Sequence, residues 1–200
     1  MKQLSKYKLN KVVDNLEYIF NNAKDTDIES GKLWYKEANN IVSSIALNNN
    51  IEPIKVASVI SALSPRNKWE RNIYDTKQVI KAYNKGLTYN DVKVCTFNNN
   101  KIKAFKILAN ELQITDKSLK TYNFVNNIAY LSKYHLTIDI WHLRAAFNKM
   151  YKIDSATIGR LAYKQIKDIT IDIANKHNLT GYQYQAIIWE AIRNNNNLIK

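Results

Sequence analysis

Two segments of the 200-residue sequence decide its interpretation: residues 120–129 read KTYNFVNNIA, and residues 136–144 read LTIDIWHLR. The first segment has the apolar spacing of an amphipathic helix, with Lys120 at its start. In the second segment, Asp139 is surrounded by leucine, isoleucine and tryptophan. A carboxylate is seldom buried without a partner, so an acid embedded in apolar sequence is either paired or used in chemistry.

The composition predicts an all-α fold. Only two prolines and four glycines occur, 46% of the residues are hydrophobic, and no long alternating runs stand out. We expect one domain over residues 1–200, a two-lobed helical bundle of about ten helices around one cleft. The expected helices are 4–22, 30–47 after a break at 25–27, 54–63, 69 to about 86, 88–94, 96–112, 120–131, 140–151, a helix capped by Asp154 or Ser155, 166–174 and 181–193.

The charge predicts a polyanionic partner. With 30 basic and 17 acidic residues the net charge is +13, which favours nucleic acid. The alternative is a compositional bias, since lysine, asparagine and isoleucine are abundant, as in AT-rich genomes. That flavour suggests a low-GC bacterial or phage source. We expect a cytoplasmic monomer.

Several classes are not expected. No apolar run is long enough to span a membrane, and the N-terminus leads into a polar helix rather than a signal core. The single cysteine, Cys95, excludes an internal disulfide and a cysteine-ligated iron–sulfur cluster. The histidines have no partners at metal-ligand spacing, so we predict neither a metal nor a cofactor.

The two opening segments resemble helix-hairpin-helix DNA glycosylases of the endonuclease III type. The pattern Lys120-Thr-x-Asn-x-Val-x-Asn-x-Ala is similar to the segment after that family's hairpin, and Ile138-Asp139 with Arg144 is similar to its valine-aspartate…arginine segment. The resemblance covers residues 54–150. It implies removal of a damaged or modified base from flipped-out DNA, with Lys120 attacking C1′ and Asp139 assisting.

The resemblance also implies DNA contacts. Residues 59–65, VISALSP, resemble the family's turn that faces DNA, and Arg66, Asn67 and Trp69 are candidates for filling the gap left by the extruded base or for phosphate contacts. For Trp69 the alternative is a core position. Lys101 lies at an expected helix start that would hold a phosphate. His142 and Arg144 follow the aspartate as further candidates, with a structural role as the alternative for the histidine.

The hairpin itself departs from the family pattern. The family has two glycines there, whereas residues 114–120 read ITDKSLK. We therefore expect a degenerate hairpin, in which a helix start capped by Thr115 or Asp116 offers backbone amides and Lys117 adds charge.

The expected chemistry has two routes. A carboxylate stabilises the oxocarbenium-like sugar that forms as an N-glycosidic bond breaks. Partial burial of Lys120 beside Tyr122 and Phe124 would lower its pKa and permit attack at C1′, a Schiff base and β-elimination. If Lys120 contacts a phosphate instead, Asp139 would activate water. Alternatively, Lys120 is a solvated charge and Asp139 a helix N-cap or an ion-pair partner of Arg144 or His142.

Two other functions fit the same segments. Phage pathways that hypermodify thymine use transferases of similar fold, which would retain Asp139 without a nucleophilic lysine. A DNA-binding module without catalysis would agree with the missing hairpin glycines.

Overall fold

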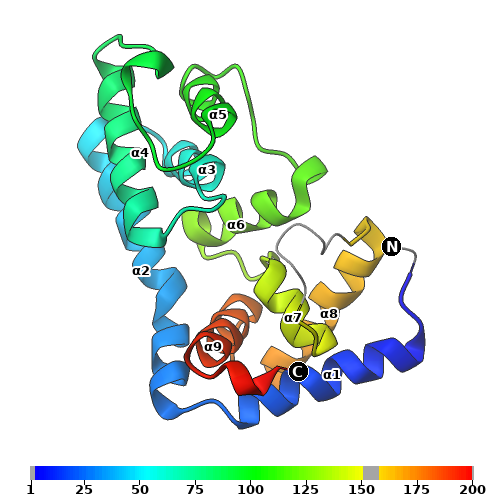
Figure 1. Ribbon diagram of the computed structural model, residues 1–200. Coiled ribbons are helices and arrows are strands. Elements are labelled where there is room, and N and C mark those ends of the chain that lie inside the picture. The colour runs from blue at the N-terminus through cyan, green and yellow to red at the C-terminus, as the bar shows by residue number, and fades with distance from the viewer. Residues whose placement is uncertain (1–2, 151–157, 200) are drawn as a thin grey trace. The chain divides into compact units, whose positions relative to one another are not determined.

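A computed structural model describes residues 3–150 and 158–199 (Figure 1). In these residues the protein is all-α, without a strand, which confirms the expected class. The α-helices are α1 (Lys6–Asn21), α2 (Asp25–Asn49), α3 (Pro53–Leu63), α4 (Trp69–Asn84), α5 (Asn98–Leu108), α6 (Leu119–Tyr130), α7 (Ile140–Phe147), α8 (Arg160–Lys176) and α9 (Gly181–Asn194). Three short 3-10 helices are η1 (Tyr89–Asp91), η2 (Asp116–Ser118) and η3 (Asn196–Leu198).

The chain forms two compact units, which we describe separately. Unit 1 contains Met1–Glu37 and Ser132–Lys200, and unit 2 contains Ala38–Leu131. Helix α2 begins in unit 1 and ends in unit 2. None of the helices in the described ranges combines the length and hydropathy needed to cross a bilayer.

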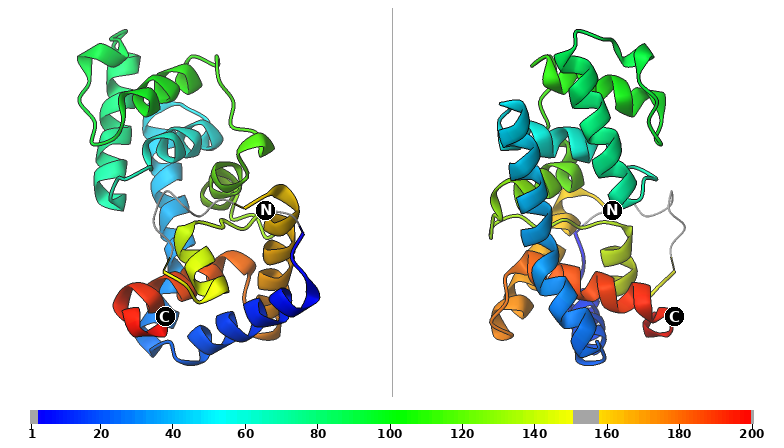
Figure 2. Two further views of the ribbon diagram at one scale, coloured as in Figure 1. Left: turned by 45° about the vertical axis from the view of Figure 1, so that its right-hand side comes forward. Right: turned by 90° about the vertical axis from the view of Figure 1, so that its left-hand side faces the viewer.

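In unit 1, α1 packs against α7, α8 and α9, and the last two also pack against each other (Figure 2). Helix α1 buries Val12, Leu16 and Ile19, which recur at the spacing of one helix face. The last helix, α9, therefore helps to close the core of unit 1 against α1. Helix α2 approaches α9 closely at Gly31, where a Cβ would lie 2.5 Å from the backbone nitrogen of Ile187.

Unit 2 is organised around α3, which packs against α4, α5 and α6. The helix is short, and residues 56–63 are all buried because neighbours cover every face. Pro53 occupies its first turn as expected, since proline lacks the N–H that would be unpaired there. Asn39 from α2 donates to the carbonyl oxygens of Ile128 and Ala129, both at 2.9 Å, and so caps the end of α6.

Several expected boundaries were wrong. Residues 25–27 form the first turn of α2, because the carboxylate of Asp27 accepts from the backbone N–H of Lys24. The expected helix at 88–94 is only η1, and the one at 140–151 ends at Phe147 because Asn148 adopts a left-handed conformation (φ 46°). The helix expected at 166–174 is part of the longer α8, and the caps expected for the helix before it, at 154 and 155, lie outside the described residues.

Candidate functional site

The segment that leads into Asp139 is fixed by a buried tyrosine. Tyr163, on α8 and 5% exposed, donates its hydroxyl hydrogen to the carbonyl oxygen of Leu136 at 2.8 Å. The same hydroxyl oxygen accepts from the backbone N–H of Ile138 at 3.1 Å. One side chain therefore satisfies two backbone groups of a segment that lies outside any helix. Because both bonds are buried, they hold the backbone immediately before Asp139 in one conformation.

A second buried tyrosine lies beside the same segment. Tyr35 of α2 donates its hydroxyl to Oε1 of Gln185 at 2.9 Å and also bonds the side chain of Thr137. Burial raises the pKa of Tyr35 well above its usual value, the bond with Thr137 opposes this, and the negative charge of Asp139 adds to the rise. The phenol is therefore a stable hydrogen-bond donor near the aspartate rather than a proton source.

Asp139 itself begins α7. It is half-buried, and its Oδ1 accepts from the backbone N–H of His142 at 2.9 Å, as an N-cap does. The expected alternative of a helix cap is thus observed. The positive end of the helix dipole favours a negative charge at this position.

His142 lies inside unit 1 rather than on its surface. It is 1% exposed, which agrees with the structural alternative for this histidine, and its contact with DNA stays a prediction. Thr170 donates its hydroxyl to the carbonyl oxygen of Ile166 at 2.8 Å, so its oxygen accepts from Nε2 of His142 at 3.0 Å. The proton therefore resides on Nε2, and Nδ1 has no hydrogen-bond partner among the described residues. Burial lowers the pKa of His142 to about 4.

Arg144 is also largely buried, with 8% of its surface exposed. Its guanidinium lies over the ring of Trp141, 4.5 Å from the centroid, one helical turn earlier in α7. The exposed fraction leaves little of the side chain for a phosphate contact, so packing against Trp141 is its evident role.

Lys120 belongs to unit 2, in the first turn of α6, and its side chain is exposed. The expected partial burial beside Tyr122 and Phe124 is therefore not seen. Of the expected caps, Thr115 precedes η2 and Asp116 is its first residue. The residue that precedes α6 is Ser118, whose side chain makes no capping bond. Lys117 is exposed one turn earlier.

The turn between α3 and α4 has a different design from the one expected. Arg66 adopts a left-handed conformation (φ 57°), is exposed, and lies over the ring of Phe97 at 5.3 Å. Asn67 is half-buried and donates to Oδ2 of Asp75 at 3.1 Å, so it fixes the turn. Trp69 is half-buried at the first position of α4.

The residue that organises this turn, Asp75, was not identified from the sequence. Its side chain is completely buried in α4 and accepts from Nε of Arg71 at 2.8 Å. It also accepts from the backbone N–H of Cys95 at 2.7 Å, and thereby joins the turn at residues 64–68 to the segment at 92–97. The bond to Asp75 raises the pKa of Arg71. The i, i+4 spacing of the two residues was the available sequence signal.

Lys101, expected to hold a phosphate, is instead buried. It is 8% exposed, and its ammonium group donates to the carbonyl oxygen of Val92 at 2.8 Å. It therefore fixes the loop before α5, and we do not retain it as a DNA contact.

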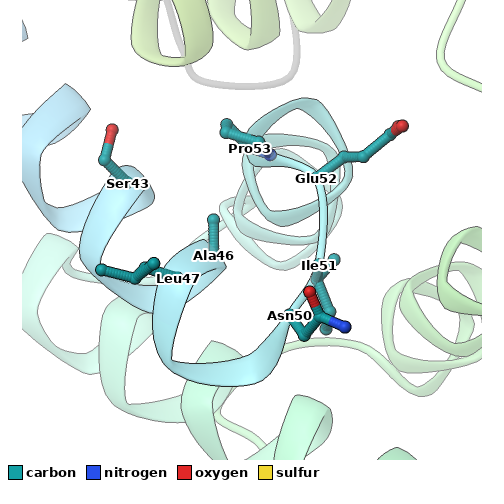
Figure 3. Close-up of a pocket in the computed structure, with 7 residues that line it drawn as sticks. All are labelled: Ser43, Ala46, Leu47, Asn50, Ile51, Glu52 and Pro53. Atoms are coloured by element: carbon teal, nitrogen blue, oxygen red, sulfur yellow. The ribbon is translucent and has the colours of Figure 1, made fainter.

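A hollow of about 410 Å³ lies where α2 ends and α3 begins (Figure 3). Its lining is largely apolar, and Glu52 is the one charged residue in it. The lining residues are Ser43, Ala46, Leu47, Asn50, Ile51, Glu52 and Pro53. None of the site residues expected from the sequence lines it, and an acidic rim does not suit a phosphate. Within residues 3–150 and 158–199, no group of histidine, cysteine and acidic side chains is arranged to hold a metal.

These observations define an all-α protein with a half-buried aspartate at a helix start in one unit and, in the other, a turn that is fixed by the buried Asp75. The chain belongs to a family of unknown function, DUF7178, which matches residues 1–196. No curated protein and no solved structure matches the chain.

Proposed function

We propose that the protein is a DNA N-glycosylase, related to the helix-hairpin-helix glycosylases, that removes a damaged or modified base. In this proposal α5, the loop with η2, and α6 take the place of the family's hairpin. The observation that carries the proposal is the setting of Asp139: a half-buried carboxylate at a helix start, after a backbone segment clamped by Tyr163. Preorganised charge of this kind stabilises a cationic transition state.

The exposed position of Lys120 favours the route through water. An enzyme activates a lysine nucleophile by desolvation or by neighbouring cations, and the exposed side chain lacks the first of these. In the proposed reaction the C1′–N bond breaks and its electron pair leaves with the base. Water then adds to C1′ and gives a proton to Asp139, and solvent carries that proton to the departed base anion, which leaves an abasic sugar and the neutral free base. Lys117 and Lys120, at the start of α6, would contact phosphates there.

The test does not require knowledge of the base. A duplex with a cationic pyrrolidine in place of one sugar mimics the charge at C1′, and a neutral tetrahydrofuran abasic site is the reference. We expect the wild-type chain to prefer the cation by about tenfold or more, which corresponds to about 1.4 kcal/mol. Asp139→Asn keeps a good N-cap but lacks the charge, so it should fold normally and lose the preference.

The matched control is Asp172→Asn, an exposed acid on α8 of the same unit, which should keep the preference. Equal binding of the two duplexes by the wild-type chain would refute the role of Asp139. On duplexes with single modified bases, base release should be lost in Asp139→Asn. Borohydride trapping then separates the two routes, because a covalent adduct that disappears in Lys120→Ala would show a lyase and replace the water route.

A further inference from the structure

Unit 2 carries two arginine–aromatic pairs on either side of the buried Asp75. Arg66 lies over Phe97, and Arg71 lies over Tyr74 with 5.1 Å between its guanidinium carbon and the ring centroid. Phe97 and Tyr74 are each 53% exposed, so both rings are accessible to a ligand. What distinguishes them from other exposed tyrosines of the chain is that an arginine of the same unit lies over each ring.

The pairs are held by a rigid scaffold. Asp75 fixes Arg71 directly and fixes the segment before Phe97 through the backbone N–H of Cys95. A further bond, from the hydroxyl of Thr96 to the carbonyl oxygen of Pro65 at 3.0 Å, joins the two loops again. The four residues of the pairs therefore belong to one connected framework in unit 2.

The charge of this surface selects the ligand. Residues 64–75 and 92–97 contain four basic side chains, at positions 66, 68, 71 and 93, and two acidic ones. One of the acidic groups, Asp75, is buried and paired with Arg71. The Nη groups of Arg71 make no hydrogen bond to the part of the chain that the structure describes, so they can meet a phosphate.

We propose that this surface binds single-stranded DNA, with unpaired bases stacked on the Arg66–Phe97 and Arg71–Tyr74 pairs. Aromatic rings and guanidinium planes both stack with bases, and they reach base faces only where neighbouring bases do not cover them. A duplex exposes phosphates but not base faces, so it would use the charges alone. That the polyanion is DNA rests on the proposed function. The aromatic pairs add that the DNA bound here is unpaired.

The test measures fluorescence anisotropy of the full chain with a labelled 12-nucleotide strand of mixed sequence, and with the same sequence as a duplex. The double variant Tyr74→Leu/Phe97→Leu keeps apolar side chains but removes both rings. Stacking is worth about 1–3 kcal/mol per base, so strand affinity should fall at least fivefold, while duplex affinity changes less than twofold. The matched control is Tyr18→Leu, a 54% exposed tyrosine on α1 of unit 1.

Unchanged strand binding in the double variant would overturn the proposal, and so would an equal loss for strand and duplex. The conservative variant Tyr74→Phe/Phe97→Tyr should retain wild-type affinity, which excludes a folding defect as the cause of a loss. A second measurement needs no variant: a strand with 5-iododeoxyuridine should photo-crosslink to Tyr74 or Phe97 in the wild-type chain, and crosslinks elsewhere only would also overturn the proposal. The cationic-sugar duplex reports on Asp139 separately, so failure of one proposal does not disguise failure of the other.

Discussion

Replacement of Tyr163 by phenylalanine removes one oxygen and tests whether the clamp before Asp139 matters. The ring still fills its buried site, because Tyr163 is 5% exposed and only the hydroxyl is lost. The N–H of Ile138 then loses its acceptor, and the carbonyl oxygen of Leu136 loses a donor. A buried donor without a partner costs about 1–3 kcal/mol, and loss of the second bond adds about 1 kcal/mol, so we expect a total of about 2–4 kcal/mol.

Two assays measure this cost. Urea unfolding followed by circular dichroism should show the decrease in the free energy of unfolding. Hydrogen exchange at the amide of Ile138 should accelerate about 30-fold or more, which is the equivalent of about 2 kcal/mol. Tyr18→Phe is the control: its ring is 54% exposed, so the change should stay within about 0.5 kcal/mol. The reasoning is refuted if Tyr163→Phe also stays within that limit and the exchange of Ile138 is unchanged.

Three further predictions concern stability. Gly31→Ala places a Cβ 2.5 Å from the backbone of Ile187, and this clash outweighs the gain in helix propensity of about 1 kcal/mol. The free energy of unfolding in urea should therefore decrease by about 2 kcal/mol or more. Gly181→Ala should lose less, because its nearest contact is a side-chain carbon of Ile171 at 2.8 Å. Because burial lowers the pKa of His142 to about 4, below the unfolded value of about 6.5, the unfolded chain gains a proton first as the pH falls. The free energy of unfolding should therefore decrease as the pH falls from about 6.5 to about 4. The reference is His142→Gln, which keeps a side-chain N–H donor but does not titrate, and the wild-type chain should lose up to about 3 kcal/mol more than this variant. Equal pH profiles of the two chains would contradict this. Asp75→Asn removes the buried charge that accepts from the backbone N–H of Cys95 and from Arg71, so it should lower the melting temperature. An unchanged melting curve would show that this carboxylate is dispensable.

The sequence contains the information for most helices because apolar spacing reports directly which face is buried. It also identifies Asp139 as unusual, since an acid among apolar neighbours is visible without coordinates. The clamp by Tyr163 was not predictable, because Tyr163 is far along the chain from the two residues that it bonds. Ile138 is 25 positions before it and Leu136 is 27 positions before it. Both roles of His142 stayed open for a related reason: a histidine in an apolar run has the same local sequence whether it lies on a surface or bonds Thr170 from inside.

Unit 2 is one continuous stretch of chain, whereas unit 1 is assembled from both ends. On a ribosome, every residue of unit 2 has been synthesised once Leu131 is made, and its contacts can form while translation continues. Helix α1, although made first, must wait for its partners α7, α8 and α9 to be synthesised. A chain that stops before Ile140 would lack all three partners and leave the apolar face of α1 exposed, so premature termination threatens solubility through the N-terminal helix rather than through the truncated end.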